Sequence, residues 1–328
     1  MVTKAYACYS LDNVERAFSS SGGIYPLVAK EVLQQNGIVY AACYDNNLNV
    51  SHMRIVDEEG IRRSQGSKYV KSSIGTTFKD VMKDIDKGYL VLFVGTPCQC
   101  AGIDSLIRET KKDRSKLILI DLVCHGVPGN AAWEAYKKSM RERGMNLISI
   151  NMRDKSTGWS NYSWRVTTDK GETIVMPRAS VSYMNGMISN LFIRPACMEC
   201  FFKGVDRCSD FTLGDYWGVR HYNPEMDDNR GTSLVLIHTP KAQELFDSIR
   251  DRIKYDNANL EKAIQSNSCL VKSVKSHPKR TEFFKRLKEG EDFINLVEEL
   301  TKENRLAFLK RKTISGIKKF VQFFGIDN

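Results

Sequence analysis

The sequence predicts an α/β protein (α+β overall), with parallel βαβ units near the N-terminus, antiparallel strands in the middle and a helical C-terminal region. Two apolar, β-branched runs at 89–95 and 116–123 flank a helical stretch at 99–110. This order of strand, helix and strand is typical of a parallel sheet that is buried on both faces. Shorter, alternating strands begin near 146, and helical periodicity prevails from about 257 to the end.

The N-terminal stretch supplies further parts of this sheet. Residues 5–9 and 38–44 are expected strands, and an amphipathic helix that ends at Gly37 lies between them, after the SSSGG segment at 19–23. A glycine-rich turn that leads from a strand into a helix is typical of phosphate-binding sites, because free N–H groups at a helix start favour anions. A flexible loop before a helix accounts for SGG equally well.

A polar and basic segment, GSKYVKS at 66–72, separates a short helix from a helix that begins near Thr76. Lys68 is a candidate to contact a phosphate, and Tyr69 is a candidate to stack on a ring. Isolated residues of these two types are more often ordinary surface groups.

Two cysteines directly follow the two strands of the βαβ unit. Cys98 comes after the strand at 89–95, and Cys124 comes after the strand at 116–123. Because parallel strands place their carboxyl ends at one edge of a sheet, both thiols are expected at that edge, where open α/β sheets bind ligands. For the neighbouring His125, a hydrogen bond within the loop is favoured over proton transfer.

The region after this unit changes to antiparallel strands. The expected elements are a helix at 130–143, strands at 147–153, 162–169 and 171–177, a helix at 182–193, strands at 210–214 and 233–239, and a helix at 241–253. The Asp-Lys-Gly turn at 169–171 joins two of these strands as a hairpin.

A CxxC pair stands within this region, at Cys197 and Cys200, with Cys208 shortly after it. CxxC presents two thiolates from one tight turn, so both reach a single metal centre when further ligands arrive from elsewhere. Local spacing favours Cys208 as the next ligand, whereas the βαβ unit offers Cys98 and Cys124. Three of the remaining cysteines are expected to be inert, namely Cys8, Cys43 and Cys269, whereas Cys100 is expected to be a helix residue whose nearness to Cys98 leaves it open as a ligand.

The charge of the chain restricts the partners that it can have. The 328 residues include 49 Lys and Arg against 39 Asp and Glu, which gives a net charge of +10. This excess suits solvated helix faces, an anionic cofactor, an acidic electron-transfer partner or a membrane surface. Nucleic acid is disfavoured as a partner, because no recognised binding module accompanies the charge.

Nine cysteines in a chain without a secretory signal indicate metal binding or redox chemistry rather than disulfides. The start, MVTKAYACYS, lacks an apolar signal-peptide core. No run of about 18 apolar residues exists that could span a membrane. A cytoplasmic location is therefore expected.

The C-terminal tail at 313–325 has an amphipathic pattern. Ile314, Ile317 and Phe320 fall on one helical stripe, and Lys318 and Lys319 fall elsewhere. Packing of this helix on the body of the protein is favoured over peripheral contact with an anionic membrane.

An ordered series of motifs resembles the beta subunit family of coenzyme F420 hydrogenases and dehydrogenases, especially its bacterial members. The resemblance covers nearly everything from Ala5 to about Ile253. It rests on SSSGG at 19–23, GSKYVKS at 66–72, FVGTPCQCAG at 93–102, DLVCHGVP at 121–128, MRDKSTGWS at 152–160, RPACMECFFK at 194–203, SDFTLGDYWG at 209–218 and GTSLVL at 231–236. Such an ordered set is highly specific to the family and says much less about the substrate.

The resemblance implies an oxidoreductase that binds FAD and one 4Fe-4S cluster, and that transfers electrons to or from coenzyme F420 or another small two-electron substrate. Many bacterial members belong to polysaccharide-synthesis loci, and they usually carry an N-terminal ferredoxin-like module. This chain lacks that module, so a separate electron-transfer protein such as a ferredoxin is the expected partner.

The resemblance also implies roles for particular residues. It points to four cluster ligands, Cys98, Cys124, Cys197 and Cys200, with Cys208 as the substitute ligand. Its flavin contacts carry over to Ser21, Gly22, Gly23, Lys68, Tyr69, Gly95, Thr96 and Pro97. Lys68 and His125 are the candidates to supply charge or protons. The family's HGVPS is HGVPG here, so Gly129 removes a hydroxyl at this position.

The expected division of the chain has three parts: an α/β flavin-binding part at 1–145, a mixed antiparallel part with the CxxC motif at 146–256, and a helical extension at 257–328. Two other functions compete with the redox hypothesis. Four thiolates can equally hold zinc in a structural or assembly protein. Thiol redox through the CxxC is weaker, because that chemistry expects the motif at a helix start in a thioredoxin-like context.

Overall fold

The computed structural model describes residues 4–302 of the chain, and two sheets organise them. The strands are β1 (Lys4–Ser10), β2 (Ile38–Tyr44), β3 (Val50–Ile55), β4 (Val91–Gly95), β5 (Leu117–Leu122), β6 (Leu147–Asp154), β7 (Ser163–Thr168), β8 (Thr173–Pro177), β9 (Phe211–Asp215), β10 (Ser233–Ile237) and β11 (Ile253–Asn257). The larger sheet has the order β11-β1-β10-β9-β5-β4-β2-β3, and the smaller has the order β6-β7-β8.

Helices lie between and around these strands. They are α1 (Asn13–Phe18), α2 (Ile24–Gln34), α3 (Glu58–Ser64), α4 (Thr77–Asp86), α5 (Pro97–Glu109), α6 (Asn130–Glu142), α7 (Ser182–Ile188), α8 (Val219–Tyr222), α9 (Pro240–Ser248), α10 (Leu260–Ser266), α11 (Arg280–Lys288) and α12 (Phe293–Thr301). Many of them begin at an Asp, Asn or Thr whose side chain accepts from a first-turn N–H, as Asp57 does for α3 and Thr239 for α9.

The larger sheet is mixed. Strands β2, β4, β5 and β9 are parallel neighbours, while β3 pairs antiparallel with β2, and β10, β1 and β11 continue antiparallel from β9. The smaller sheet is antiparallel throughout. The parallel unit around 89–123, the antiparallel middle and the C-terminal helices confirm the predicted fold class.

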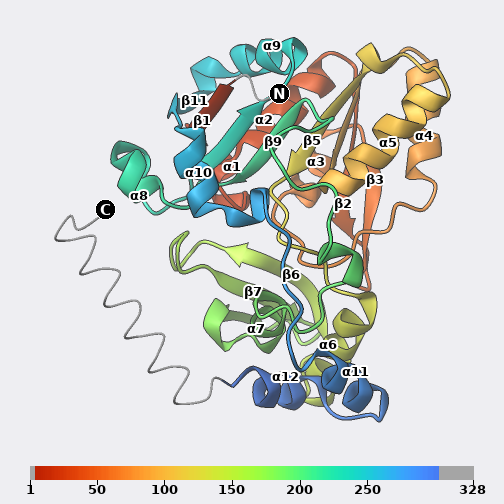
Figure 1. The fold of residues 1–328 in the computed structure, drawn as a ribbon, viewed down its shortest axis with the longest axis vertical. Helices are drawn as coiled ribbons and strands as arrows, with labels where there is room; N and C mark the ends of the chain where they lie inside the picture. The colour runs from red at the N-terminus through yellow and green to blue at the C-terminus, as the bar shows by residue number, and fades with distance from the viewer. Residues whose placement is uncertain (1–3, 303–328) are drawn as a thin grey trace.

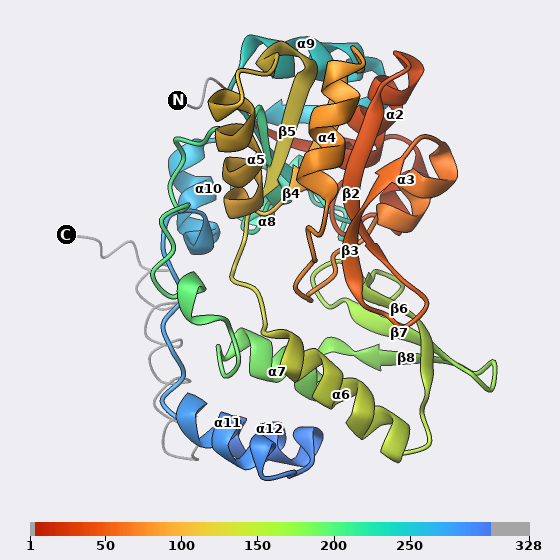
Figure 2. The same ribbon diagram turned by 90° about the vertical axis from the view of Figure 1, so that its right-hand side faces the viewer.

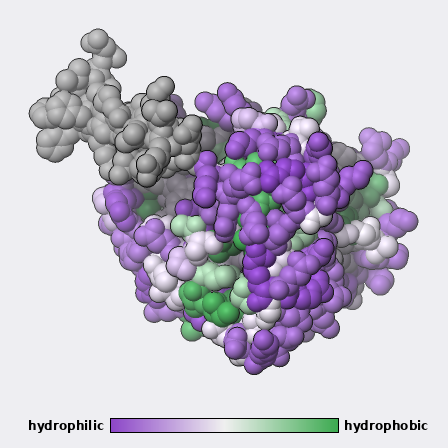
Figure 3. Space-filling model, turned by 90° about the horizontal axis from the view of Figure 1, so that it is seen from below, coloured by the Kyte–Doolittle hydropathy of each residue, from purple (hydrophilic) through white to green (hydrophobic). Residues whose placement is uncertain are grey.

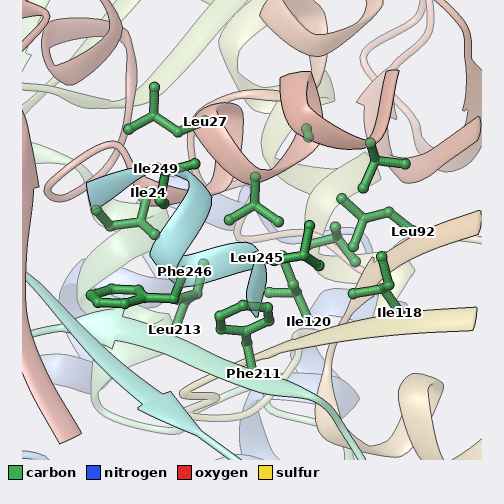
Figure 4. Close-up of a cluster of buried hydrophobic side chains, with 14 of the residues drawn as sticks. Ile24, Leu27, Leu92, Ile118, Ile120, Phe211, Leu213, Leu245, Phe246 and Ile249 are labelled. Carbon is green, nitrogen blue, oxygen red and sulfur yellow. The ribbon is translucent and has the colours of Figure 1, made fainter. Parts of the chain in front are cut away.

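Both faces of the larger sheet are covered, which explains why its central strands are apolar at nearly every position. In β4, Leu92 and Val94 pack toward α2 and α9, whereas Val91 and Phe93 pack toward α4 and α5. Side chains alternate between the two faces of a strand, so a sheet between two helix layers needs apolar residues at every position. Figure 4 shows the first of these cores, with Phe246 of α9 above the sheet.

The smaller sheet forms a second layer with α6, α7, α11 and α12. Its core is rich in aromatic rings, and Tyr136 and Tyr183 contact each other with ring centroids 5.3 Å apart. In Figure 1 this layer lies below the larger sheet. The surface seen from below is mostly hydrophilic, with small scattered hydrophobic areas (Figure 3).

Several element boundaries differ from the predicted ones. The helix expected at 182–193 ends at Ile188, because Asn190 takes a left-handed φ of 65° and the Leu191 N–H turns back to the Gly186 carbonyl. The helix expected at 99–110 begins earlier, at Pro97, a residue well suited to the first helical position.

Four elements were not predicted, namely α1, β3, α8 and β11. The helix expected at 241–253 ends at Ser248, and the chain then forms β11, which pairs with β1 at the edge of the larger sheet. The tail at 313–325 lies outside the described residues, so its predicted packing or membrane contact stays a prediction. No helix within residues 4–302 has the length and apolar character needed to cross a membrane.

Candidate functional site

The carboxyl ends of β4, β5 and β9 lie at the edge of the larger sheet that meets the β6–β8 layer (Figures 1 and 2). We call this boundary the seam. The residues that follow these strands are Thr96, Val123 and Tyr216, and Arg153 of β6 pairs with Asp215 at the end of β9. Such an edge is where α/β sheets usually bind ligands.

The loop after β5 closely approaches the CxxC segment. The Arg194 N–H donates to the Val127 carbonyl at 3.0 Å, and the Val127 N–H lies 3.5 Å from the Cys197 sulfur. A Cβ on Gly126 would lie 3.4 Å from the Cβ of Cys197 and 2.9 Å from Ile193, so the missing side chain permits this approach. The glycine of the CHGVP motif therefore brings the Cys124 loop against the CxxC segment.

Cys98 reaches the seam from the first turn of α5. Thr96 caps this helix in a capping box, in which its own N–H donates to the Gln99 side chain at 2.9 Å. The Thr96 hydroxyl lies 3.2 Å from the Cys98 sulfur, and Cys98 is exposed. Thr96 and Pro97 therefore shape the helix start that presents the thiol, a role that follows directly from their position at the cap.

Electrostatics links the four predicted cluster ligands. Burial is the main cause that raises the pKa of the Cys124 thiol to about 12. The positive charge of Lys203 lowers this pKa. Negative charge on the other three predicted ligands, Cys197, Cys98 and Cys200, raises it further. Cys98, Cys197 and Cys200 thus lie within electrostatic reach of Cys124. Within residues 4–302, no three His, Cys, Asp or Glu side chains stand in an arrangement ready to hold a metal ion. A shared metal centre would therefore require the thiols to turn toward one another.

Cys208 has different neighbours. Burial raises the pKa of its thiol to about 11, the carboxylates of Asp104 and Asp121 raise it further, and Arg114 lowers it. Its carbonyl accepts from the Arg114 guanidinium at 3.2 Å. The strongest charges on Cys208 are therefore these two carboxylates and Arg114, whereas the strongest charges on Cys124 are Lys203 and the other three predicted ligands.

The SSSGG segment packs against the larger sheet. The Gly22 N–H donates to the Ser233 hydroxyl at 2.9 Å, and a Cβ on Gly22 would lie 2.2 Å from the Cys8 carbonyl oxygen. The Ser21 hydroxyl donates to the Thr232 carbonyl, and Gly23 starts α2 with a φ of 84°, where glycine is favoured. Close backbone packing and a left-handed turn explain these glycines without any ligand.

Replacing Gly22 by Ala is expected to lower the free energy of unfolding by about 3 kcal/mol, because the new methyl group would collide with rigid backbone of β1 and β10. Urea unfolding followed by fluorescence measures this loss. The matched control is Gly129→Ser, since Gly129 has open space around its Cβ position and precedes α6 with a φ of −70°. Serine there should leave stability unchanged or raise it by about 0.5 kcal/mol. Equal effects of the two changes would contradict the packing argument.

The GSKYVKS segment lies beside SSSGG. The Ser67 N–H donates to the Ser20 hydroxyl at 2.6 Å. The Lys68 ammonium donates at 2.9 to 3.1 Å to three carbonyls around the end of α3, those of Ser64, Gln65 and Gly66. Burial lowers the pKa of Lys68 to about 8. All three of its N–H donors therefore have partners within the protein, which leaves none for a phosphate in this conformation.

Arg153 is a residue of the seam that sequence reasoning did not select. Its guanidinium binds both oxygens of Asp215 at 2.9 and 3.1 Å, and it donates to the Tyr69 hydroxyl at 3.2 Å and to the Ser20 carbonyl at 3.0 Å. Trp159 also donates to Asp215, at 2.9 Å. Arg153 and Trp159 belong to the MRDKSTGWS motif and Asp215 to SDFTLGDYWG, but only the fold shows that the two motifs meet.

Two buried polar atoms near Tyr69 have no hydrogen-bond partner within the described part of the chain: the Nε atom of Arg153 and the hydroxyl of Tyr44. The Arg153 side chain is only 3% exposed. Unpartnered buried donors are rare and usually mark an unseen partner. Tyr69 is linked to both residues, because its hydroxyl accepts from Arg153 and it raises the pKa of Tyr44.

His125 donates from Nε2 to the Asn190 side chain at 2.7 Å, and burial lowers its pKa, so the ring is neutral at physiological pH. Gly95 closes β4, where a Cβ would lie 2.9 Å from the Phe93 ring. The structure therefore gives His125 a hydrogen-bonding role and Gly95 a packing role at the seam.

Comparison with known families shows to which family the chain belongs. The profile for the C terminus of the coenzyme F420 hydrogenase/dehydrogenase beta subunit matches residues 89–263, more than half of the chain. The chain belongs to this family. No curated protein sequence matches it. As a member of the F420 hydrogenase/dehydrogenase beta subunit family, the chain is related to subunits of redox enzymes, which supports the redox class of function.

A solved structure has the same fold as this member of the family. The chain is similar to a chain of the F420-reducing [NiFe] hydrogenase complex from Methanosarcina barkeri, with 15% identity and a TM-score of 0.56. The alignment covers 84% of this chain and 96% of that chain. At this identity the similarity shows a shared fold.

The donors of this beta-subunit family member fit an iron–sulfur cluster by their chemistry, since thiolates are the ligands of such clusters and the loop of Cys124 contacts the CxxC segment. For a flavin, the fit depends on the unpartnered Arg153 and Tyr44 atoms rather than on the predicted phosphate contacts. Gly22 and Lys68 are already engaged within the protein.

Proposed function

We propose that the chain is an iron–sulfur flavoprotein that transfers electrons between a 4Fe-4S cluster, FAD and a small two-electron substrate, with coenzyme F420 as the first candidate. The observation that carries this proposal is that Cys98 and Cys124 follow the neighbouring parallel strands β4 and β5, while the loop of Cys124 contacts the CxxC segment, with the Val127 N–H 3.5 Å from the Cys197 sulfur. These contacts join segments that are far apart in the sequence. Membership of a family of hydrogenase and dehydrogenase subunits supports a redox role.

In this proposal the four cysteines would hold the cluster, and Lys203 would organise the loops around it. The Lys203 ammonium donates to the Cys124 carbonyl and, at 2.7 Å, to the Cys269 carbonyl. Its positive charge favours thiolate at Cys124, which is the form that binds iron. When bound, the cluster and the flavin would supply one-electron and two-electron transfer.

The seam would hold the flavin beside Tyr69. Arg153 stacks over the Tyr162 ring at 4.2 Å and is fixed by Asp215, so its free Nε–H has a defined direction. Tyr44 offers a second free polar group. The neutral His125 keeps an unprotonated Nδ1 when its Nε2 donates to Asn190, so it would accept a proton rather than supply one.

Anaerobic purification followed by iron, zinc and flavin analysis tests this function. We expect about four irons and one flavin per chain, with visible absorption that bleaches on reduction. Zinc without flavin, also after reconstitution, would instead identify a zinc-stabilised structural or assembly protein. If activity survives the replacement of Cys98 but is lost when Cys197 or Cys200 is replaced, thiol redox chemistry at the CxxC pair would be favoured. A loaded protein would then be assayed with F420, nicotinamides and reduced ferredoxin.

A further inference from the structure

A basic segment runs along the CxxC loop. We call residues 269–280 the basic strap. Three hydrogen bonds tie it to the loop: Lys203 to the Cys269 carbonyl at 2.7 Å, the Gly204 N–H to the Leu270 carbonyl at 2.9 Å, and the Cys200 N–H to the Ser273 hydroxyl at 3.0 Å. Figure 1 shows this blue segment descending from α10 toward α11. The strap is therefore fixed against the segment that carries two predicted cluster ligands.

The charge of this stretch is entirely positive. Between Glu261 and Glu282 the sequence has no acidic residue, and its basic residues are Lys262, Lys272, Lys275, Lys279 and Arg280. Lys272 and Lys275 flank the Ser273 contact and are exposed. Neither forms an ion pair within the described residues. Unpaired surface cations at one place create a local field that attracts an acidic partner.

An exposed aromatic side chain lies beside this charge. Phe201 follows Cys200 directly and is 94% exposed, and Phe202 is 40% exposed. Cys98 is exposed as well. Exposed aromatic rings next to charged residues are typical of interaction sites, where they become anchors on binding. The acidic residues of the loop, Glu199 and Asp206, are fewer than the cations of the strap.

We infer that Phe201 and the exposed lysines of the basic strap form the docking surface for an acidic electron-transfer protein of the ferredoxin type. This inference rests on the proposed function, because it places the docking surface where electrons would enter the cluster. The lysines steer the partner by charge, and Phe201 anchors it by burial. The strap holds both features in one position relative to Cys200.

The test measures binding of two acidic probes, a plant-type 2Fe-2S ferredoxin and a flavodoxin, to the full chain with its iron content determined first. Lys272→Glu/Lys275→Glu is expected to slow association at least about tenfold at about 20 mM salt, and this difference should vanish near 0.5 M. The matched control, Lys87→Glu/Lys170→Glu, has the same charge change at exposed positions away from the strap. It should leave association within about twofold of the parent chain.

Phe201→Ala gives an independent readout. We expect it to speed dissociation about tenfold at every salt concentration, because it removes burial rather than charge. Failure of both probes to bind an iron-loaded chain, or equal effects of the strap and control pairs, would overturn the docking surface and leave the proposed function standing. A chain that takes up no iron would instead refute the proposed function, whatever the probes do. If both double variants slow association equally, in proportion to the change in net charge, the attraction between the chain and the probes is non-specific, which would also overturn the docking surface.

Discussion

Replacement of Cys124 by Ser is expected to reduce bound iron from about four atoms per chain to less than about one, with loss of the visible cluster absorption. Cys124 lies in the loop after β5 that contacts the CxxC segment, where the Val127 N–H is 3.5 Å from the Cys197 sulfur. Serine removes the only sulfur that the loop after β5 supplies. Iron analysis and visible spectroscopy of protein reconstituted under identical anaerobic conditions measure the effect.

Cys208→Ser is the matched control for this substitution. Its thiol is half-buried, and the strongest charges on it are those of Asp104, Asp121 and Arg114. We expect it to retain the iron content of the parent chain within about 10–20%. Full iron with Cys124→Ser and loss of iron with Cys208→Ser would show instead that local spacing around the CxxC, and not the sheet edge, selects the ligands.

Replacement of Arg207 by Met is expected to lower the free energy of unfolding by about 3–5 kcal/mol. Arg207 pairs with Asp121 at 2.7 Å, and their side chains are only 4% and 1% exposed. Loss of the guanidinium would leave a carboxylate buried at the end of β5 with the neutral hydroxyls of Ser209 and Thr212 as its partners. Urea unfolding of metal-free protein measures the loss. The double variant Arg207→Met/Asp121→Asn should recover most of it, because no charge then remains buried.

The Arg207–Asp121 pair also predicts how the free energy of unfolding depends on pH. Burial raises the pKa of Asp121 above its ordinary value, although Arg207 lowers it. The folded state therefore binds more protons than the unfolded state between the unfolded pKa, about 3.9, and the folded one, and stability falls as pH rises through that interval. In Arg207→Met the folded pKa rises further. The loss of unfolding free energy caused by Arg207→Met should thus be smallest below about pH 4 and should grow toward neutral pH. A loss that does not change with pH would show that lost packing, and not the buried charge, is responsible.

The central sheet could be predicted from the sequence, because a strand that is buried on both faces has apolar residues at nearly every position. The runs at 89–95 and 116–123 are apolar at nearly every position, and the structure covers each alternate set with a different pair of helices. The same parallel geometry predicted that Cys98 and Cys124 share an edge. Strand β11 gave no such signal, because it lies at the edge of the sheet and its residues are largely exposed.

The role of the seam could not be predicted, because it depends on contacts between segments that are distant in sequence. Gly22 has the appearance of a phosphate-loop residue, yet its missing side chain meets the Cys8 carbonyl. Arg153 has the appearance of an ordinary strand residue, yet it connects Asp215 with Tyr69. A motif shows that a position is constrained, and only the fold shows which neighbouring residue constrains it.

The path of the chain has a consequence for how a metal centre could be assembled. The chain leaves the larger sheet after β5, builds the whole β6–β8 layer, and only then supplies the CxxC pair before it returns through β9. A centre that joins Cys124 with Cys197 would close this excursion into a ring, which restricts the unfolded chain and couples metal uptake to correct docking of the layers. Iron loading would then act as quality control during biogenesis. Chains with a misdocked middle layer would remain colourless and would be the first to be degraded by proteases.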